Sequence, residues 1–186
     1  MATDEVLVCK TFSFDSSHQL IGHFGKCANV HGHTYKLEVK VKDIPTVYRS
    51  PSEVCEDTSL NTQQVMYQSN ESRSNEGFVI DFYHLKTIVN DLIVEPMDHA
   101  FLAKGDEPIL PVLKAEGTKV VVLGFRTTVE NMCRYICWKL LLAGLPVHSV
   151  RMWETPTGWA EVLADDIDTI QGPNYRTMGC GCDLDD

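Results

Sequence analysis

Two early segments of the chain alternate between hydrophobic and polar residues. The alternating apolar positions are Val6, Val8, Phe12 and Phe14 in residues 6–14, and Tyr35, Leu37, Val39 and Val41 in residues 34–42. Strict alternation is typical of a strand with one buried and one hydrated face. We therefore predict two antiparallel strands that pair with each other across the segment between them.

The region after residue 76 predicts a strand that runs into a helix. Residues 77–82, GFVIDF, have strand character, and Asp81 is placed to cap a helix over about 82–94. A side-chain oxygen at this position can accept a hydrogen bond from a backbone N–H of the first helical turn. Pro96 is expected to end this helix.

The C-terminal half predicts a second helix between strands. Residues 118–123 are typical of a short strand, and apolar residues recur at helical spacing from 129 to 141. Thr127-Thr-Val-Glu130 matches a capping box at the start of that helix. Two strands follow at about 147–154 and 159–165, joined by a Pro-Thr-Gly turn.

These elements together predict the fold class. The coarse order is strand, strand, helix, helix, strand, strand, which indicates one α+β domain over 1–186 with two helices on one face of an antiparallel four-stranded sheet. Residues 43–76 are polar and lack periodicity, so we expect an insertion or long loop there. At about 172–186 we expect a flexible acidic tail, although its Cys180 and Cys182 leave a second metal site open.

Composition excludes some classes of function. The net charge of −10 argues against a nucleic-acid-binding surface, because the sequence contains no Lys/Arg cluster that could neutralise phosphates. The longest apolar runs are far shorter than the roughly 20 residues that a membrane span needs. The first residues lack a secretory pattern, so we expect a cytoplasmic protein.

The cysteines are expected to be free thiols. The chain has seven, an odd number, and shows no sign of an oxidising compartment. Cys9, Cys133 and Cys137 fall at positions that the strand and helix patterns predict to be buried. Cys55 lies in the polar segment and has no assigned role.

Histidines suggest a metal centre between the first two strands. His31 and His33 are two residues apart and point the same way on a strand, and pairing could bring His18 opposite them. Three histidines leave one coordination position open, as in catalytic zinc sites. His23 could compete by spacing alone. Cys27 could be a fourth ligand of a closed structural site, or a free thiol for chemistry.

Seven short motifs resemble one enzyme family. They are FSFDSSH (12–18), GKC (25–27), HGHTY (31–35), GFVIDF (77–82), MDH (97–99), TTVEN (127–131) and WET (153–155). Their order is similar to that of the 6-pyruvoyl-tetrahydropterin synthase / 6-carboxy-tetrahydropterin synthase family, over about 6–165 without the insertion. The resemblance implies the tunnelling fold (T-fold) with ββααββ order. It also implies closed barrels, typically hexamers of two trimers, with active sites between subunits.

The resemblance also implies a role for each candidate site residue. The implied zinc ligands are His18, His31 and His33, the catalytic residues Cys27, Asp98 and His99, and the pterin-binding residues Glu154, Thr127 and Thr128. Glu130 is expected mainly to cap its helix.

The spacing of the cysteine and histidines bears on the reaction. Cys-x-x-x-His-x-His resembles the 6-carboxy-tetrahydropterin synthases, whereas the biopterin-pathway enzymes usually carry two more residues before the histidines. The implied reaction converts 7,8-dihydroneopterin triphosphate to 6-carboxy-5,6,7,8-tetrahydropterin, acetaldehyde and triphosphate, toward 7-deazaguanine nucleosides such as queuosine. Formation of 6-pyruvoyl-tetrahydropterin is the alternative. A pterin-binding module with a structural zinc site of one cysteine and three histidines is the non-enzymatic alternative.

Overall fold

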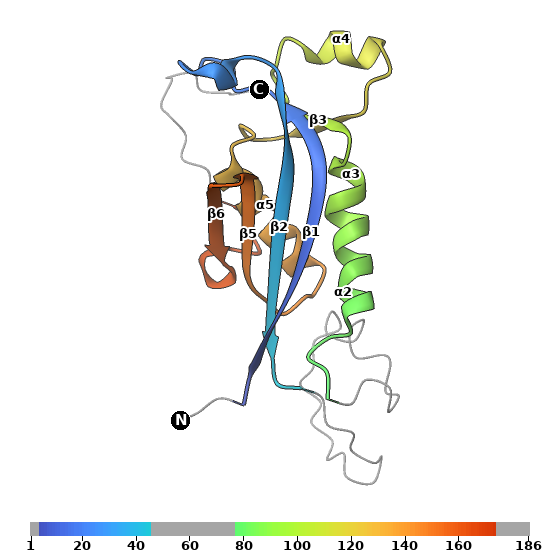
Figure 1. The fold of residues 1–186 in the computed structure, drawn as a ribbon, viewed down its shortest axis with the longest axis vertical. Coiled ribbons are helices and arrows are strands. Elements are labelled where there is room, and N and C mark those ends of the chain that lie inside the picture. The colour runs from blue at the N-terminus through green and yellow to red at the C-terminus, as the bar shows by residue number, and fades with distance from the viewer. Residues whose placement is uncertain (1–3, 46–76, 174–186) are drawn as a thin grey trace.

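The computed structural model describes residues 4–45 and 77–173 (Figure 1). Most of the predicted insertion and of the predicted tail, with Cys55, Cys180 and Cys182, lies outside these residues. Within the described part of the chain, no helix has the length and apolar character needed to cross a bilayer.

The first two strands form the centre of the sheet. β1 (Val6–His18) and β2 (His31–Asp43) pair antiparallel along their whole length, from Val6 opposite Asp43 to His18 opposite His31. The inward apolar residues of β2 are fully buried: Tyr35, Leu37, Val39 and Val41. The prediction that the two strands pair across the histidine segment is confirmed.

The two C-terminal strands extend the sheet beyond β2. β5 (Val147–Thr155) pairs antiparallel with β2, and β6 (Gly158–Leu163) pairs antiparallel with β5. Both strands and the turn between them agree with the alternation and turn signals of the sequence.

The prediction of a purely antiparallel four-stranded sheet is wrong, because the sheet has six strands and is mixed, in the order β4-β3-β1-β2-β5-β6. β3 (Ala100–Lys104) runs parallel to the end of β1, and β4 (Val120–Leu123) runs parallel to β3. The short helix α4 (Leu110–Ala115) connects the two. Sequence analysis missed β3 because four of its five residues are buried, so hydrophobic and polar residues do not alternate along it.

The first long helix begins where it is predicted to begin, but no strand directly precedes it. Residues 77–81 form turns and bends rather than a strand, and Val79 and Ile80 pack against the core without a partner strand. α2 (Phe82–Val89) is capped as expected, because the Asp81 carboxylate accepts a hydrogen bond from the Tyr83 N–H at 2.6 Å.

Pro96 does not end this helix, contrary to the prediction. The helix continues through a π-helical turn, η3 (Asn90–Val94), into α3 (Glu95–Met97), so Pro96 lies inside it. Proline cannot donate a backbone hydrogen bond, and the wide turn directly before it gives the helix a change of hydrogen-bond pattern at that point.

The second long helix, α5 (Val129–Leu142), packs on the same face of the sheet as α2. Its buried residues join one core with those of α2, η3 and the inward side of β2, which confirms that both helices cover one face. The predicted capping box is wrong: Thr128 is the N-cap, but its side chain makes no capping hydrogen bond. The neighbouring Thr127 contacts a histidine instead, as described below.

The described cysteines are free, and two of the three predicted burials are confirmed. Cys133 and Cys137 lie in the core, where burial raises the pKa of each thiol to about 12. Cys9 is exposed, contrary to the prediction. Its neighbour Val8 faces the core side of β1, and successive strand residues point to opposite faces.

The face of the sheet away from the helices carries a network of charged side chains around Glu161. The Glu161 carboxylate accepts hydrogen bonds from Arg151 at 2.6 Å, Ser149 at 3.0 Å and Lys40 at 3.1 Å. Burial alone would raise the pKa of Glu161, but these hydrogen bonds outweigh burial and bring the pKa down to about 2. The network therefore stabilises the fold only while Glu161 is ionised.

Glu161→Gln is expected to lower the free energy of unfolding by about 1–3 kcal/mol at pH 7. Because the folded pKa is depressed from 4.5 to about 2, this stabilisation is present above pH 4.5 and is lost as pH falls toward 2. Urea unfolding of both proteins between pH 7 and pH 2.5 measures the difference, with Glu116→Gln, at an exposed position after α4, as the control. A difference that stays constant across this range would contradict the assignment.

Candidate metal centre and active site

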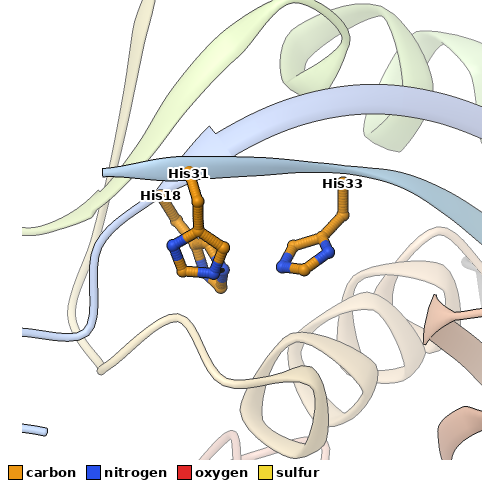
Figure 2. A group of neighbouring side chains, drawn as sticks. All are labelled: His18, His31 and His33. Atoms are coloured by element: carbon orange, nitrogen blue, oxygen red, sulfur yellow. Dashed lines mark hydrogen bonds between the residues drawn. The ribbon is translucent and has the colours of Figure 1, made fainter. Parts of the chain in front are cut away.

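Strand pairing brings three histidines together at one end of β1 and β2. His18 lies directly opposite His31 in the antiparallel register, and His33 is two residues further along β2. Figure 2 shows the three side chains projecting from the same side of these strands. One nitrogen from each ring lies within 4.8 Å of the others, and the His18 and His31 Nε2 atoms are 3.1 Å apart.

The other ring nitrogens of two histidines are held by backbone carbonyls. His18 Nδ1 is 2.9 Å from the Thr127 carbonyl oxygen, and His31 Nδ1 is 2.8 Å from that of Asn29. A carbonyl oxygen can only accept, so each Nδ1 carries the proton and donates it. Each Nε2 lone pair is then free to bind a metal ion, as in known histidine metal sites.

Burial favours the neutral form of the cluster. Burial, with smaller contributions from the neighbouring histidines, lowers the pKa of His18 to about 4, and burial also lowers the pKa of His33. His33 Nε2 is buried without a hydrogen-bond partner. Neutral imidazoles with converging lone pairs and an unsatisfied buried nitrogen fit a divalent metal ion such as zinc.

Glu154 lies beside this cluster at the end of β5. Its Oε1 atom is 3.6 Å from His18 Nε2 and 3.8 Å from His33 Nε2. The residue expected to anchor the pterin therefore lies next to the residues expected to bind the metal.

The two threonines before α5 have different environments. Thr127 is fully buried, and its hydroxyl oxygen lies 3.3 Å from His18 Nδ1, in addition to the carbonyl contact. Thr128 is half-buried, and its side chain makes no capping bond. Sequence reasoning expected both to contact the pterin and missed that Thr127 orients a histidine. No local signal marks this contact, since Thr127 and His18 are 109 residues apart.

Cys27 belongs to a short 3-10 helix, η1 (Lys26–Ala28), in the loop between β1 and β2. The loop is closed by hydrogen bonds from the Leu20 N–H to the Cys27 carbonyl at 2.8 Å and from the Gln19 amide to the Ala28 carbonyl at 2.7 Å. The Cys27 thiol is partly buried and is not a member of the histidine group described above.

Asp98 and His99 form a separate pair at the end of α3. Asp98 Oδ2 accepts a hydrogen bond from His99 Nδ1 at 2.9 Å, while Asp98 Oδ1 accepts one from the Asp15 N–H at 2.9 Å. The backbone hydrogen bond from Asp15 and then the bond from His99 lower the pKa of Asp98. An ionised Asp98 holds His99 in the tautomer that leaves Nε2 free for proton transfer.

The Asp98–His99 pair borders a hollow at the same end of β1 and β2 as the metal cluster. His99 lines this hollow of about 400 Å³ together with Asp15, Ser17 and Thr34, and His33 of the cluster lines it as well. Along β1 and β2, Asp15, Ser17 and Thr34 alternate with His18 and His33, so these three side chains point to the other face of the sheet. The candidate residues thus form two groups, one with the histidines and Glu154, the other with Asp98 and His99.

Comparison with known proteins identifies the family. The 6-pyruvoyl tetrahydropterin synthase family model matches residues 7–50 and 61–165. The chain belongs to this family. A 6-carboxy-5,6,7,8-tetrahydropterin synthase from Haemophilus influenzae is 36% identical over 83% of this chain and 96% of its own length. A relative of the same name from Aquifex aeolicus is 28% identical over 83% of this chain and 95% of its own length.

Solved structures of the family support the fold. The 6-pyruvoyl tetrahydropterin synthase of Caenorhabditis elegans aligns with a TM-score of 0.53 at 20% identity, covering 86% of this chain and 95% of that one. The enzyme from Plasmodium falciparum gives the same TM-score at 19% identity, covering 86% of this chain and 98% of that one. Every candidate site residue falls within the ranges that the family model matches.

Proposed function

We propose that this protein is a zinc-dependent 6-carboxy-5,6,7,8-tetrahydropterin synthase. It would convert 7,8-dihydroneopterin triphosphate and water to 6-carboxy-tetrahydropterin, acetaldehyde and triphosphate, as a step in queuosine biosynthesis. The observation that carries this proposal is the convergence of one ring nitrogen from each of three histidines beside Glu154, in a chain 36% identical to a relative of that name.

The histidines His18, His31 and His33 would hold the zinc ion. A bound zinc ion supplies a Lewis acid that lowers the pKa of the side-chain hydroxyls of a dihydropterin. Two carbonyl-bound Nδ1 atoms keep His18 and His31 in the tautomer that binds a metal through Nε2. In the metal-binding half of the site, the protein fixes the imidazole rings of these two histidines before the substrate binds.

Glu154 would orient the substrate. Its carboxylate can accept two parallel hydrogen bonds from the 2-amino group and the adjacent ring N–H of a pterin. Its position beside His18 and His33 supports a pterin bound with its side chain near the metal cluster. Thr128, which has no capping role, is free to contact the pterin ring as well.

Cys27 and the Asp98–His99 pair would move protons. The Cys27 Sγ atom, as thiolate, accepts a proton from the carbon framework of the substrate side chain. His99 Nε2 exchanges a second proton, while Asp98 holds Nδ1–H and stabilises the protonated ring. The proposed reaction needs such proton transfers because the substrate side chain is cleaved while the pterin ring is reduced by internal rearrangement.

We also propose that each active site is shared between subunits of a homo-oligomer, a hexamer built from two trimers. Two observations support sharing: the His99 side chain is 77% exposed, and its hollow is lined in part by Asp15, Ser17 and Thr34, whose strand positions face away from the histidine cluster. A second copy would supply the Asp98–His99 pair to the metal cluster of the first.

Incubation of the purified, zinc-loaded protein with 7,8-dihydroneopterin triphosphate tests the proposal. The expected pterin product, identified by mass spectrometry, is 6-carboxy-tetrahydropterin, accompanied by acetaldehyde. A 6-pyruvoyl product would instead establish the alternative activity, for which the family is named. Tight pterin binding without any product would indicate a binding module with a structural zinc site.

A further inference from the structure

His99 has an unusual backbone conformation. Among the described residues, it is the non-glycine residue with a positive φ, at 56°. This left-handed region is disfavoured for residues with a side chain, and such residues persist where neighbouring contacts hold them. The contacts that hold His99 therefore also determine where its imidazole lies.

β1 holds the turn that contains His99, residues 97–99, from one side. The His99 N–H donates to the Asp15 carbonyl at 2.6 Å, and the Ser16 hydroxyl donates to the Met97 carbonyl at 2.6 Å. With the bond from the Asp15 N–H to the Asp98 carboxylate, β1 contacts every residue from Met97 to His99.

Lys119 holds the turn from the other side. It directly precedes β4, and its backbone carbonyl accepts a hydrogen bond from the Phe101 N–H at 2.9 Å, which places it beside the end of α3. Its ammonium group donates to the Glu95 carbonyl at 2.6 Å and to the Asp98 carbonyl at 2.7 Å. These are carbonyls that the end of a helix leaves without intrahelical partners.

The Asp98 carbonyl belongs to the peptide bond that leads into His99. A cation bound to this oxygen and to a second one on the preceding turn restricts rotation of that peptide, and so fixes the backbone direction at His99. Lys119 is also a positive charge near the Asp98 carboxylate, and it favours the ionised form of that group.

We propose that Lys119 is a positioning residue for the Asp98–His99 pair. This inference rests on the proposed proton-transfer role of His99. It assigns a function to the β3–α4–β4 unit, because Lys119 lies in this unit directly before β4 and contacts the turn that contains His99. An exposed lysine normally keeps its ammonium group hydrated, whereas this one gives two short hydrogen bonds to backbone carbonyls of a single turn.

Lys119→Met is expected to lower kcat by about ten- to a hundredfold, with KM and zinc content unchanged, because a small displacement of a catalytic group is enough for such a loss. Lys119→Arg can reach the same carbonyls with its guanidinium group and is expected to retain kcat within about threefold. Lys114→Met, which removes the same charge from the exposed side of α4, is the matched control and is expected to retain wild-type kcat.

A double-variant comparison shows whether Lys119 acts through His99. Lys119→Met added to His99→Ala is expected to cause no further loss of kcat, since there is no imidazole left to position. If His99→Ala lowers kcat but Lys119→Met does not, this inference is wrong while the proposed function stands. If His99→Ala itself retains full kcat, the proton-transfer role of His99 is wrong. An equal loss of kcat in Lys119→Met and Lys119→Arg, together with a lowered midpoint of unfolding, would show that Lys119 acts on stability alone. The inference would then be wrong.

Discussion

Cys27→Ala is expected to lower product formation by about a thousandfold while leaving one zinc ion bound per chain. The thiol is expected to take a proton directly from the substrate, and loss of a general base typically costs a factor of about 10²–10⁴. Zinc is expected to remain because the histidine cluster forms without the cysteine. Activity by product mass and zinc content by atomic absorption measure the two effects separately.

Two matched variants complete this experiment. His33→Ala removes a ligand and is expected to lose both zinc and activity, whereas Cys9→Ala, at an exposed thiol on β1, is expected to change neither. Loss of zinc from Cys27→Ala would show that the cysteine is a fourth ligand and that the site is a closed structural one. Full turnover by Cys27→Ala would refute its catalytic role.

Co-refolding equal amounts of Cys27→Ala and His99→Ala chains is expected to restore about a quarter of wild-type activity, although each variant alone is nearly inactive. If each site takes Cys27 from one chain and His99 from another, random assembly gives one site in about four with both groups intact. The reason lies in the geometry of one chain, where Cys27 belongs to the loop between β1 and β2 while His99 follows α3 with an exposed side chain. Turnover of the mixture under saturating substrate measures the recovery.

The control for this mixture uses two variants from the same group. Cys27→Ala combined with His33→Ala is expected to stay inactive, because both residues lie near the same end of β2 and serve one site together. An inactive mixture of Cys27→Ala and His99→Ala, with hetero-oligomers confirmed by native mass spectrometry, would place the whole site within one chain.

Sequence patterns predicted the elements whose two faces differ. The alternation in β1 and β2 and the helical spacing in α5 each arise because one side contacts the core and the other contacts water. β3 was missed because it is buried on both faces and has no such contrast. The error at Pro96 has another cause: sequence rules treat proline as a stop, but a π-helical turn lets the helix pass through it.

The site was predictable as far as it depends on local spacing. His31 and His33 are identified by their separation on a strand, and His18 by the pairing of two strands. The contacts of Thr127 with His18 and of Lys119 with the Asp98 carbonyl could not be predicted. They join residues far apart in the chain, and each uses a backbone carbonyl, which every residue has and no sequence pattern marks.

The direct opposition of His18 and His31 has a consequence for how such enzymes can diverge. Strand pairing, rather than the length of the loop between them, sets the separation of these two histidines. Residues can therefore be added to or removed from the loop without changing the separation of the two histidines, while the Cys27 thiol that the loop carries is moved to a new position. Under the proposed mechanism, a change in loop length would move the proton-transferring thiol relative to the substrate while His18 and His31 stay in place, which gives evolution a simple route to a different product.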